Sequence, residues 1–244
     1  MPLFRALFLF QTMKNKYKMK KPKNLFLILF LGFCFSVIEA QEKAKDTSVY
    51  REDQFYFGIS MVFLTSSNTN LNPSGISRNL QWGFIRDIPF TREGQWAAGV
   101  GLGMAFNRYT TNFERTINEG GVNYRFIDNE QNDPFFISQS ALELPLTLRW
   151  RNSTPTDYAF WRVYGGVSLQ WFYASNGKLS KERFNIKNDL MNWGATAHIS
   201  LGYNTWNFYI GYSLNELFSS NIHDKATTNL DVRPIKIGLI FFVL

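Results

Sequence analysis

The chain has 244 residues, with 26 Lys and Arg against 19 Asp and Glu and a formal net charge of +7. Residues 1–40 hold 7 of the basic and 1 of the acidic side chains, which leaves 19 basic and 18 acidic residues beyond them. This near-neutral remainder excludes a basic nucleic-acid-binding surface. The only cysteine, Cys34, also lies in the first 40 residues, so the rest of the chain has no disulfide or thiol chemistry.

Residues 1–40 have the pattern of a signal peptide. Lysines precede the apolar run LFLILFLGFCFSVI, and Ala40 occupies a small-residue cleavage position. The sequence predicts cleavage after Ala40, with an upstream start extension before Met13 or Met19. The alternative is an N-terminal membrane anchor, but a run of about 14 residues is shorter than the roughly 20 that a spanning helix needs.

The polar residues 41–53 are predicted to form a short periplasmic lead-in, and residues 54–244 a single all-β domain. Apolar and small or polar side chains alternate in eight segments of this domain, as expected for strands. The segments are 54–65, 77–90, 95–109, 136–150, 160–174, 191–204, 206–218 and 232–244.

Segment 95–109 indicates which face meets which environment. The even-numbered positions carry bulky side chains such as Trp96 and Leu102, and the odd-numbered positions carry Gly99, Gly101 and Gly103. Small residues suit a cramped interior and bulky apolar residues suit lipid. The sequence therefore predicts an eight-stranded antiparallel up-and-down transmembrane β-barrel that follows a cleaved signal peptide.

The connections between these segments alternate in length. Short ones (91–94, 151–159 and Asn204–Thr205) alternate with long polar ones (66–76, 110–135, 175–190 and 219–231). Outer-membrane barrels have short periplasmic turns and long outer loops. We therefore expect an outer-membrane protein with both termini in the periplasm.

Aromatic residues gather near the strand ends, which favours a membrane barrel over a soluble lipocalin-like barrel of eight strands. The expected girdle at the short-turn end comprises Trp96, Trp150, Trp161 and Trp206. The expected girdle at the long-loop end comprises Phe106, Phe136, Trp171 and Trp193. A solvated outer face would also carry more Lys and Glu than the small-residue face does.

Five ionisable residues have inward parity and are predicted to form a structural network in the lumen: Glu143, Arg149, Arg162, Lys236 and His198. An eight-stranded barrel is filled by its side chains, and an isolated buried charge costs several kcal/mol. The predicted ion pair joins Glu143 to Lys236 or Arg162. A proton or ion path is the alternative role. Arg86, Arg92, Arg149, Arg151 and Asp157 are expected to gather at the periplasmic rim.

The sequence offers little support for catalysis. His198-Ile199-Ser200 is similar to the His-x-Ser pair of outer-membrane lipid A deacylases, but both side chains have inward parity and no carboxylate completes the set. No spacing indicates a metal site or a cofactor site, so we expect a protein that is not an enzyme. Loop 110–135 carries Phe113, Tyr124 and Phe126 among charges, which favours an adhesin-like or ligand-binding surface.

Four stretches together resemble the PorT-like outer-membrane β-barrel family of Bacteroidota. They are WGFIRDIPF (82–90), ELPLTLRWRNSTP (143–155), FWRVYGGVSL (160–169) and GYNTWNFYIGYSLNELF (202–218). The resemblance implies an accessory role in type IX protein secretion and gliding, with secretion-system subunits as partners. The expected surroundings are outer-membrane lipid and lipopolysaccharide. The chain departs from one general pattern, because barrels inserted by the outer-membrane assembly machinery more often end in an aromatic residue than in a residue such as Leu244.

Overall fold

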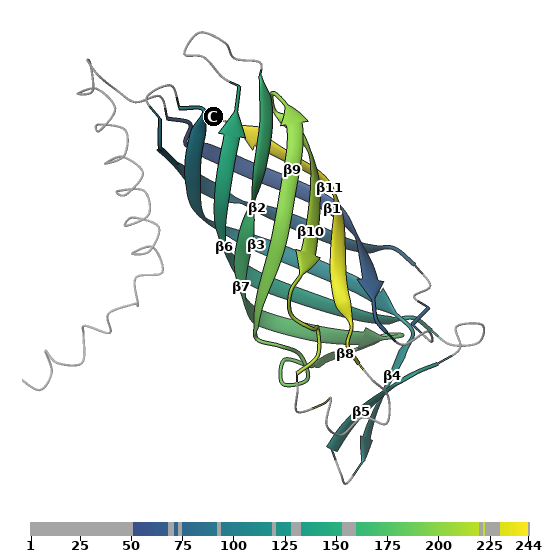
Figure 1. The fold of residues 1–244 in the computed structure, drawn as a ribbon. Helices are drawn as coiled ribbons and strands as arrows, with labels where there is room; N and C mark the ends of the chain where they lie inside the picture. Colours follow the sequence, from purple (N-terminus) through teal and green to yellow (C-terminus); the bar gives the residue numbers. More distant parts are fainter. Residues whose placement is uncertain are drawn as a thin grey trace, which may run out of the picture. The chain divides into compact units, whose positions relative to one another are not determined.

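The computed structural model describes residues 51–67, 71–72, 75–91, 94–118, 121–127, 133–152, 160–219, 222 and 230–243, so the predicted signal peptide lies outside the described residues. These residues form an all-β unit (Figure 1). The strands are β1 (Gln54–Thr65), β2 (Ser77–Pro89), β3 (Trp96–Thr111), β4 (Phe113–Asn118), β5 (Gly121–Phe126), β6 (Phe135–Arg151), β7 (Trp161–Leu179), β8 (Glu182–Asn185), β9 (Trp193–Tyr203), β10 (Trp206–Ser213) and β11 (Arg233–Val243). No helix among the described residues has the length and hydropathy needed to span a membrane.

Eight strands close into an antiparallel barrel, as the sequence predicts. Their order is β6-β3-β2-β1-β11-β10-β9-β7, and β7 pairs back with β6. The first and last strands pair from Phe55 with Val243 to Thr65 with Arg233. Closure leaves no edge strand along the wall, which is the condition for a sheet to cross a bilayer.

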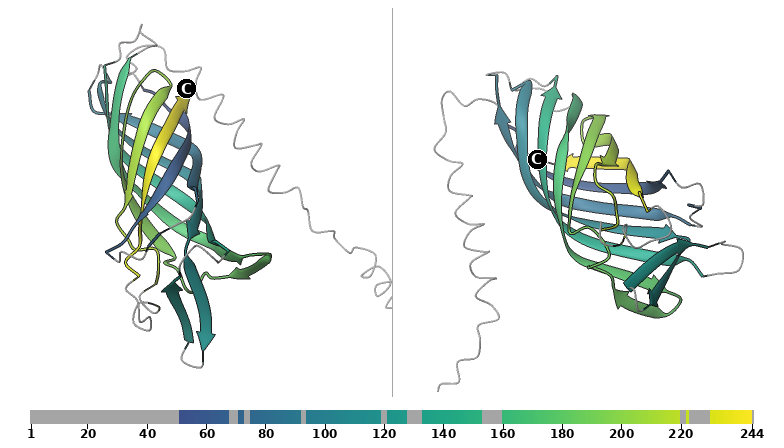
Figure 2. Two further views of the ribbon diagram at one scale, coloured as in Figure 1. Left: turned by 90° about the vertical axis from the view of Figure 1, so that its right-hand side faces the viewer. Right: turned by 60° about the horizontal axis from the view of Figure 1, so that its bottom comes forward.

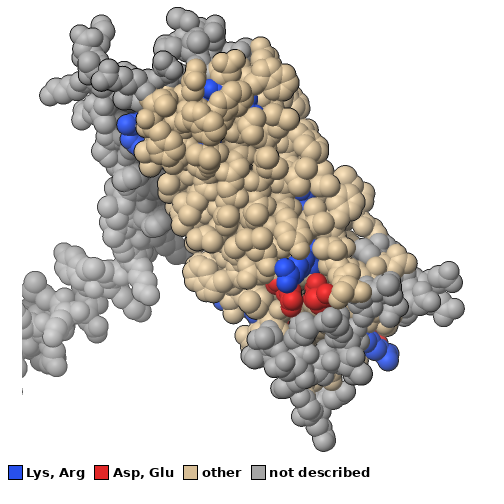
Figure 3. All heavy atoms as spheres, in the orientation of Figure 1, with Lys and Arg blue, Asp and Glu red and all other residues tan. Residues whose placement is uncertain are grey.

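The two faces of the wall have the predicted characters. Phe55 and Leu102 point outward and are 64% and 65% exposed, whereas Asn79 and Gln81 point inward and are buried. The middle of the wall carries few charged side chains on the face drawn in Figure 3. Bulky apolar groups therefore face the lipid, and polar or small groups fill the lumen.

One row of paired residues shows why glycine is needed inside. Tyr56, Gly83, Gly103 and Glu143 are register partners in succession across β1, β2, β3 and β6. A Cβ atom on Gly83 would lie 2.8 Å from Cε1 of Tyr56, and one on Gly103 would meet the Tyr56 hydroxyl. The two glycines thus give the Tyr56 ring the space to reach toward Glu143.

The strand bounds differ from the predicted segments at the long-loop end. β7 continues to Leu179 and pairs with the short β8, whereas β10 ends at Ser213 rather than at residue 218. The predicted loop 110–135 contains the hairpin β4–β5, a separate two-stranded sheet. The end of β7, the short β8 and the hairpin lie beyond the lipid-facing part of the wall. The inward–outward alternation that identifies a membrane strand no longer applies there.

The hairpin projects from the barrel end that lies away from the C-terminus (Figures 1 and 2). We call this end the long-loop end. The other, which holds the turn Asn204–Thr205, is the short-turn end. Asn204 has a φ of 55°, a conformation that asparagine tolerates better than most residues and that a two-residue hairpin turn requires.

We predict that Gly103→Val lowers the free energy of unfolding by about 1–3 kcal/mol, because its side chain overlaps the Tyr56 ring. Met104→Val is the matched control, since its side chain lies on the outward face of the same strand. Urea unfolding of the barrel in phospholipid vesicles, followed by tryptophan fluorescence, measures both. Equal stability of the two variants would show that the lumen has room to spare beside Gly103.

Candidate functional site

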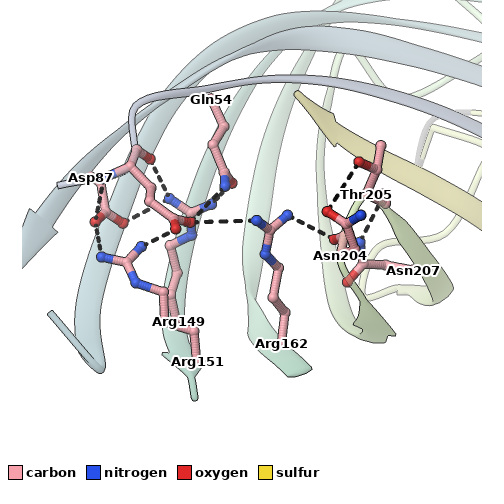
Figure 4. A network of polar contacts seen from close by, with 9 residues as sticks. Gln54, Asp87, Arg149, Arg151, Arg162, Asn204, Thr205 and Asn207 are labelled. Atoms are coloured by element: carbon pink, nitrogen blue, oxygen red, sulfur yellow. Dashed lines mark hydrogen bonds and ion pairs between the residues drawn. The ribbon is translucent and has the colours of Figure 1, made fainter. Parts of the chain in front are cut away.

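Buried charges from separate strands meet in the lumen at the short-turn end (Figure 4). Arg149 Nη1 lies 2.7 Å from Asp87 Oδ1, and Arg151 Nη2 lies 2.7 Å from Asp87 Oδ2. Arg149 also donates to the side-chain oxygen of Gln54. The two arginines come from β6, the aspartate from β2 and the glutamine from the start of β1. One carboxylate therefore receives two guanidinium groups.

Glu52 extends this network from outside the strands. Its carboxylate lies 3.4 Å from Arg151 and 3.6 Å from Arg162, and its backbone NH donates to Asp87. Glu52 is only 1% exposed. We call Glu52, Gln54, Asp87, Arg149, Arg151 and Arg162 the mouth network. It ties the residues before β1 to the wall of the barrel.

Loss of one charged side chain from the mouth network is expected to lower the stability of the barrel. Arg149 and Arg151 are 0% exposed, and Arg149 also stacks on the Tyr164 ring at 4.2 Å. Charges removed from water need opposite charges and hydrogen bonds, and loss of one partner costs about 3–5 kcal/mol. The arrangement holds charges in fixed positions and fills the mouth of the lumen.

The sequence places Arg149 and Arg162 in the lumen, and the structure finds them there. The predicted ion pair of Glu143 with Arg162 is wrong, because the register partner of Arg162 is Arg151. Glu143 lies roughly 27 Å further along β6 at about 3.4 Å per residue. The missed acids are Asp87, whose inward parity was visible in the sequence, and Glu52, which carries no such signal.

Of the other residues expected at this rim, Arg86 is an outward side chain that pairs with Asp53 at 3.3 Å. Arg151 belongs to the mouth network. Arg92 and Asp157 lie outside the described residues.

Glu143 and Lys236 lie in the middle of the lumen, and both are 2% exposed. Within the described part of the chain they form no direct ion pair, and Lys236 Nζ and Glu143 Oε2 have no hydrogen-bond partner. Gln170 Nε2 donates to Glu143 at 3.4 Å. A cavity of about 20 Å³ beside Glu143 has space for one water molecule. This layer is thus nearly filled.

His198 and Ser200 both point into the lumen, as their parity predicts. His198 Nδ1 lies 3.4 Å from Ser168 Oγ, and its ring stacks on Tyr209 with centroids 5.8 Å apart. A nucleophilic serine needs an adjacent base that a carboxylate orients. The described contacts of His198 and Ser200 do not form that chain.

Apolar side chains cover the lumen at the long-loop end. We call this group the apolar cap: Val62, Tyr109, Phe113, Tyr124, Phe135, Ile137, Ile186, Leu190, Leu217, Phe218, Ile222, Leu230 and Val232. The rings of Phe113 and Phe218 meet edge to face at 5.2 Å, and Tyr124 lies 5.0 Å from Phe218. Residues from several connections thus pack into one cluster.

A buried polar contact fixes the hairpin β4–β5 onto the apolar cap. Asp189, from the segment after β8, accepts hydrogen bonds from Arg115 Nε at 2.8 Å and from the Tyr124 hydroxyl at 2.7 Å. Burial and the bond to the Asp189 carboxylate raise the pKa of Tyr124, so this hydroxyl stays a donor at neutral pH. The base of the hairpin is therefore held, while Ile117 near its tip is 70% exposed.

The residues predicted for the two girdles point outward. Trp96 pairs with Trp150 across β3 and β6, and Trp161 and Trp206 both pair with Tyr203. At the other end, Trp171 pairs with Trp193. Phe106 and Phe136 lie on neighbouring strands near the same end. Their contact with the membrane interfaces stays a prediction.

Among the described residues, no group of three or more His, Cys, Asp or Glu side chains is placed to hold a metal ion. The candidate site is the long-loop end, because a hairpin fixed at its base by Asp189 presents the exposed Ile117 there. The lumen contributes charges and packing beneath it.

A family model described as an outer membrane protein beta-barrel domain matches residues 39–219. Among curated proteins no relative matches the chain. The crystal structure of Ail, the attachment invasion locus protein of Yersinia pestis, matches with a TM-score of 0.35 and 13% identity, over 78% of this chain and 96% of that one. The outer membrane protein OprG from Pseudomonas aeruginosa matches with a TM-score of 0.35 and 12% identity, over 80% and 97%.

We predict that Asp87→Asn lowers the free energy of unfolding by about 3–5 kcal/mol, because two buried arginines lose a shared counter-charge. Asp53→Asn is the matched control. Its ion-pair partner Arg86 is 57% exposed, and exposed pairs contribute about 0–1 kcal/mol. Urea unfolding in vesicles measures the difference. If both variants lose the same stability, the mouth network does not hold the barrel together.

Proposed function

The chain belongs to the outer membrane protein beta-barrel domain family, and from this premise we propose that it is a closed barrel that binds a partner through its long-loop end. Both termini lie in the periplasm in this proposal, and the hairpin β4–β5 faces the outside of the cell. The observation that carries it is the hairpin itself, held at its base by Asp189 and exposed at Ile117.

The orientation rests on connection lengths. The links between β2 and β3, β6 and β7, and β9 and β10 are short, and the start of β1 and the end of β11 share that side of the barrel. Outer-membrane barrels have short turns in the periplasm and longer loops outside. The hairpin would then stand where another cell or a soluble partner can reach it.

The filled interior supports binding of a partner at the surface rather than transport through the lumen. The mouth network occupies one end and the apolar cap the other. An eight-stranded barrel has an interior just wide enough for its own side chains. An adhesin-like role needs only a rigid wall and an exposed surface, and this protein has both.

The face of the hairpin that would bind is set by its register. Phe113 pairs with Phe126 and Arg115 with Tyr124, so Ile117 and its partner Val122 continue the same face toward the tip. Ile117 is exposed, although Phe113 and Tyr124 on the same face of the hairpin are buried. An exposed branched apolar residue on a held hairpin is a suitable anchor for an apolar pocket of a partner protein.

We predict that cells carrying the barrel attach to a film of extracellular-matrix proteins, and that Ile117→Asn reduces this attachment about tenfold, the loss expected when a buried interface anchor is removed. Thr116→Asn is the matched control, because it introduces the same side chain on the opposite face of β4. Counting attached cells on matrix and albumin films gives the readout. Equal attachment of the two variants would exclude Ile117 as the anchor.

A second candidate function comes from the sequence resemblance to PorT-like barrels. Three stretches of that resemblance, 82–90, 143–155 and 160–169, supply Asp87, Arg149, Arg151 and Arg162 of the mouth network. A rigid short-turn end supports docking of a periplasmic partner, as an accessory component of type IX secretion would require.

For this second candidate we expect deletion of the gene to reduce the proteins secreted across the outer membrane and to impair gliding. Comparison of the culture supernatant with that of a complemented strain checks the effect. Secretion and motility that both stay at the wild-type level would remove the secretion role and leave the adhesin-like one.

A further inference from the structure

Basic side chains form a row on the outside of the barrel near the long-loop end. Arg78 of β2 is the register partner of Arg108 of β3, and Lys178 of β7 is the partner of Arg183 of β8. Between them, Arg108 and Phe136 lie on adjacent strands, and Phe136 pairs with Lys178. We call Arg78, Arg108, Lys178 and Arg183 the basic row. It extends over five neighbouring strands, with a step of two residues in register between Arg108 and Phe136.

The basic row has no acidic partner among the described residues. Other exposed arginines do have one, since Arg86 pairs with Asp53, Arg125 with Glu114 and Arg233 with Glu216. Like charges directly opposite each other on neighbouring strands are destabilising, so a bound anion would stabilise this arrangement. The row therefore offers several cations to an anion that this part of the chain does not supply.

Two shallow grooves lie along the basic row. One of about 290 Å³ is lined by Arg78, Arg108, Thr110 and Phe136, and the other of about 250 Å³ by Arg108, Phe136, Lys178 and Arg183. The Arg108 guanidinium lies 4.5 Å from the centroid of the Phe136 ring, which holds it in place between the two grooves. The cations are therefore arranged around a shared concave surface.

An apolar groove leads away from the basic row along the wall. It measures about 410 Å³ and is lined by Arg78 and Arg108 together with Ile59, Leu80 and Phe106. These apolar side chains point outward with the rest of the lipid-facing wall. A ligand with an anionic head and an acyl chain would fit both parts at once.

We propose that the basic row binds the phosphate groups of an outer-leaflet glycolipid, the class to which lipopolysaccharide belongs. Arginine is well suited to this ligand, because its guanidinium binds phosphate through two parallel hydrogen bonds. Acyl chains of the lipid lie in the groove beside Leu80 and Phe106. The proposal rests on the orientation proposed above, which places this end of the wall in the outer leaflet.

Native mass spectrometry of the full mature barrel in detergent tests the site. The probes are a bis-phosphorylated lipid A, the same lipid without its phosphates, and inorganic phosphate as a competitor. The wild type binds the phosphorylated lipid at least tenfold more tightly than the dephosphorylated one. Arg78→Gln with Arg108→Gln loses this preference, because both arginines shared by the apolar groove are neutralised.

Arg51→Gln with Arg86→Gln is the matched control, since it removes the same charge from exposed residues at the short-turn end. This variant keeps the wild-type preference. Both double variants are first shown to be folded by their heat-dependent migration in gels. An unchanged preference in Arg78→Gln with Arg108→Gln overturns the proposal, as does displacement of the lipid by an equal concentration of inorganic phosphate.

A single cysteine at Lys181→Cys, treated on intact cells with a membrane-impermeant maleimide, tests the orientation separately. Residue 181 is exposed in the turn between β7 and β8. Labelling from outside, together with equal binding of the two lipids, overturns the lipid site alone. Absence of labelling overturns the orientation, and with it both this proposal and the outward-facing hairpin.

Discussion

Pairing of the first strand with the last is the interaction on which the rest of the structure depends. The hydrocarbon core of a bilayer offers no partner for backbone NH and C=O groups, so the sheet must close on itself. β1 and β11 meet this requirement from Phe55 with Val243 to Thr65 with Arg233. Closure over eight strands leaves a lumen so narrow that small and polar side chains face inward and bulky apolar ones face the lipid.

The narrow lumen limits which surfaces of the protein can bind a ligand or a partner. Asp87 and Glu52 hold three arginines in the mouth network, the Tyr56 ring crosses Gly83 and Gly103 in the middle, and the apolar cap closes the long-loop end. Little space is left for a ligand inside. The adhesin-like role and the lipid site therefore lie on the held hairpin and on the outer wall, and the secretion role lies at the short-turn end.

The sequence predicts the barrel because inward–outward alternation is a local property of each strand, read two residues at a time. It does not predict the partners of the lumen charges, because these depend on the stagger between strands that closure sets. Arg162 therefore meets Glu52 rather than Glu143. The hairpin β4–β5 was missed for another reason: its Phe113 and Tyr124 pack on other loops, so no lipid-facing period marks it.

Electrical recording tests the closed barrel most directly. The mature protein, without its predicted signal peptide, is inserted into a planar lipid bilayer beside a large water-filled porin as a positive control. The account predicts no stable conductance step, because the mouth network and the apolar cap fill the two ends of the lumen. A steady open channel at low voltage would contradict this account and would indicate that the lumen conducts ions.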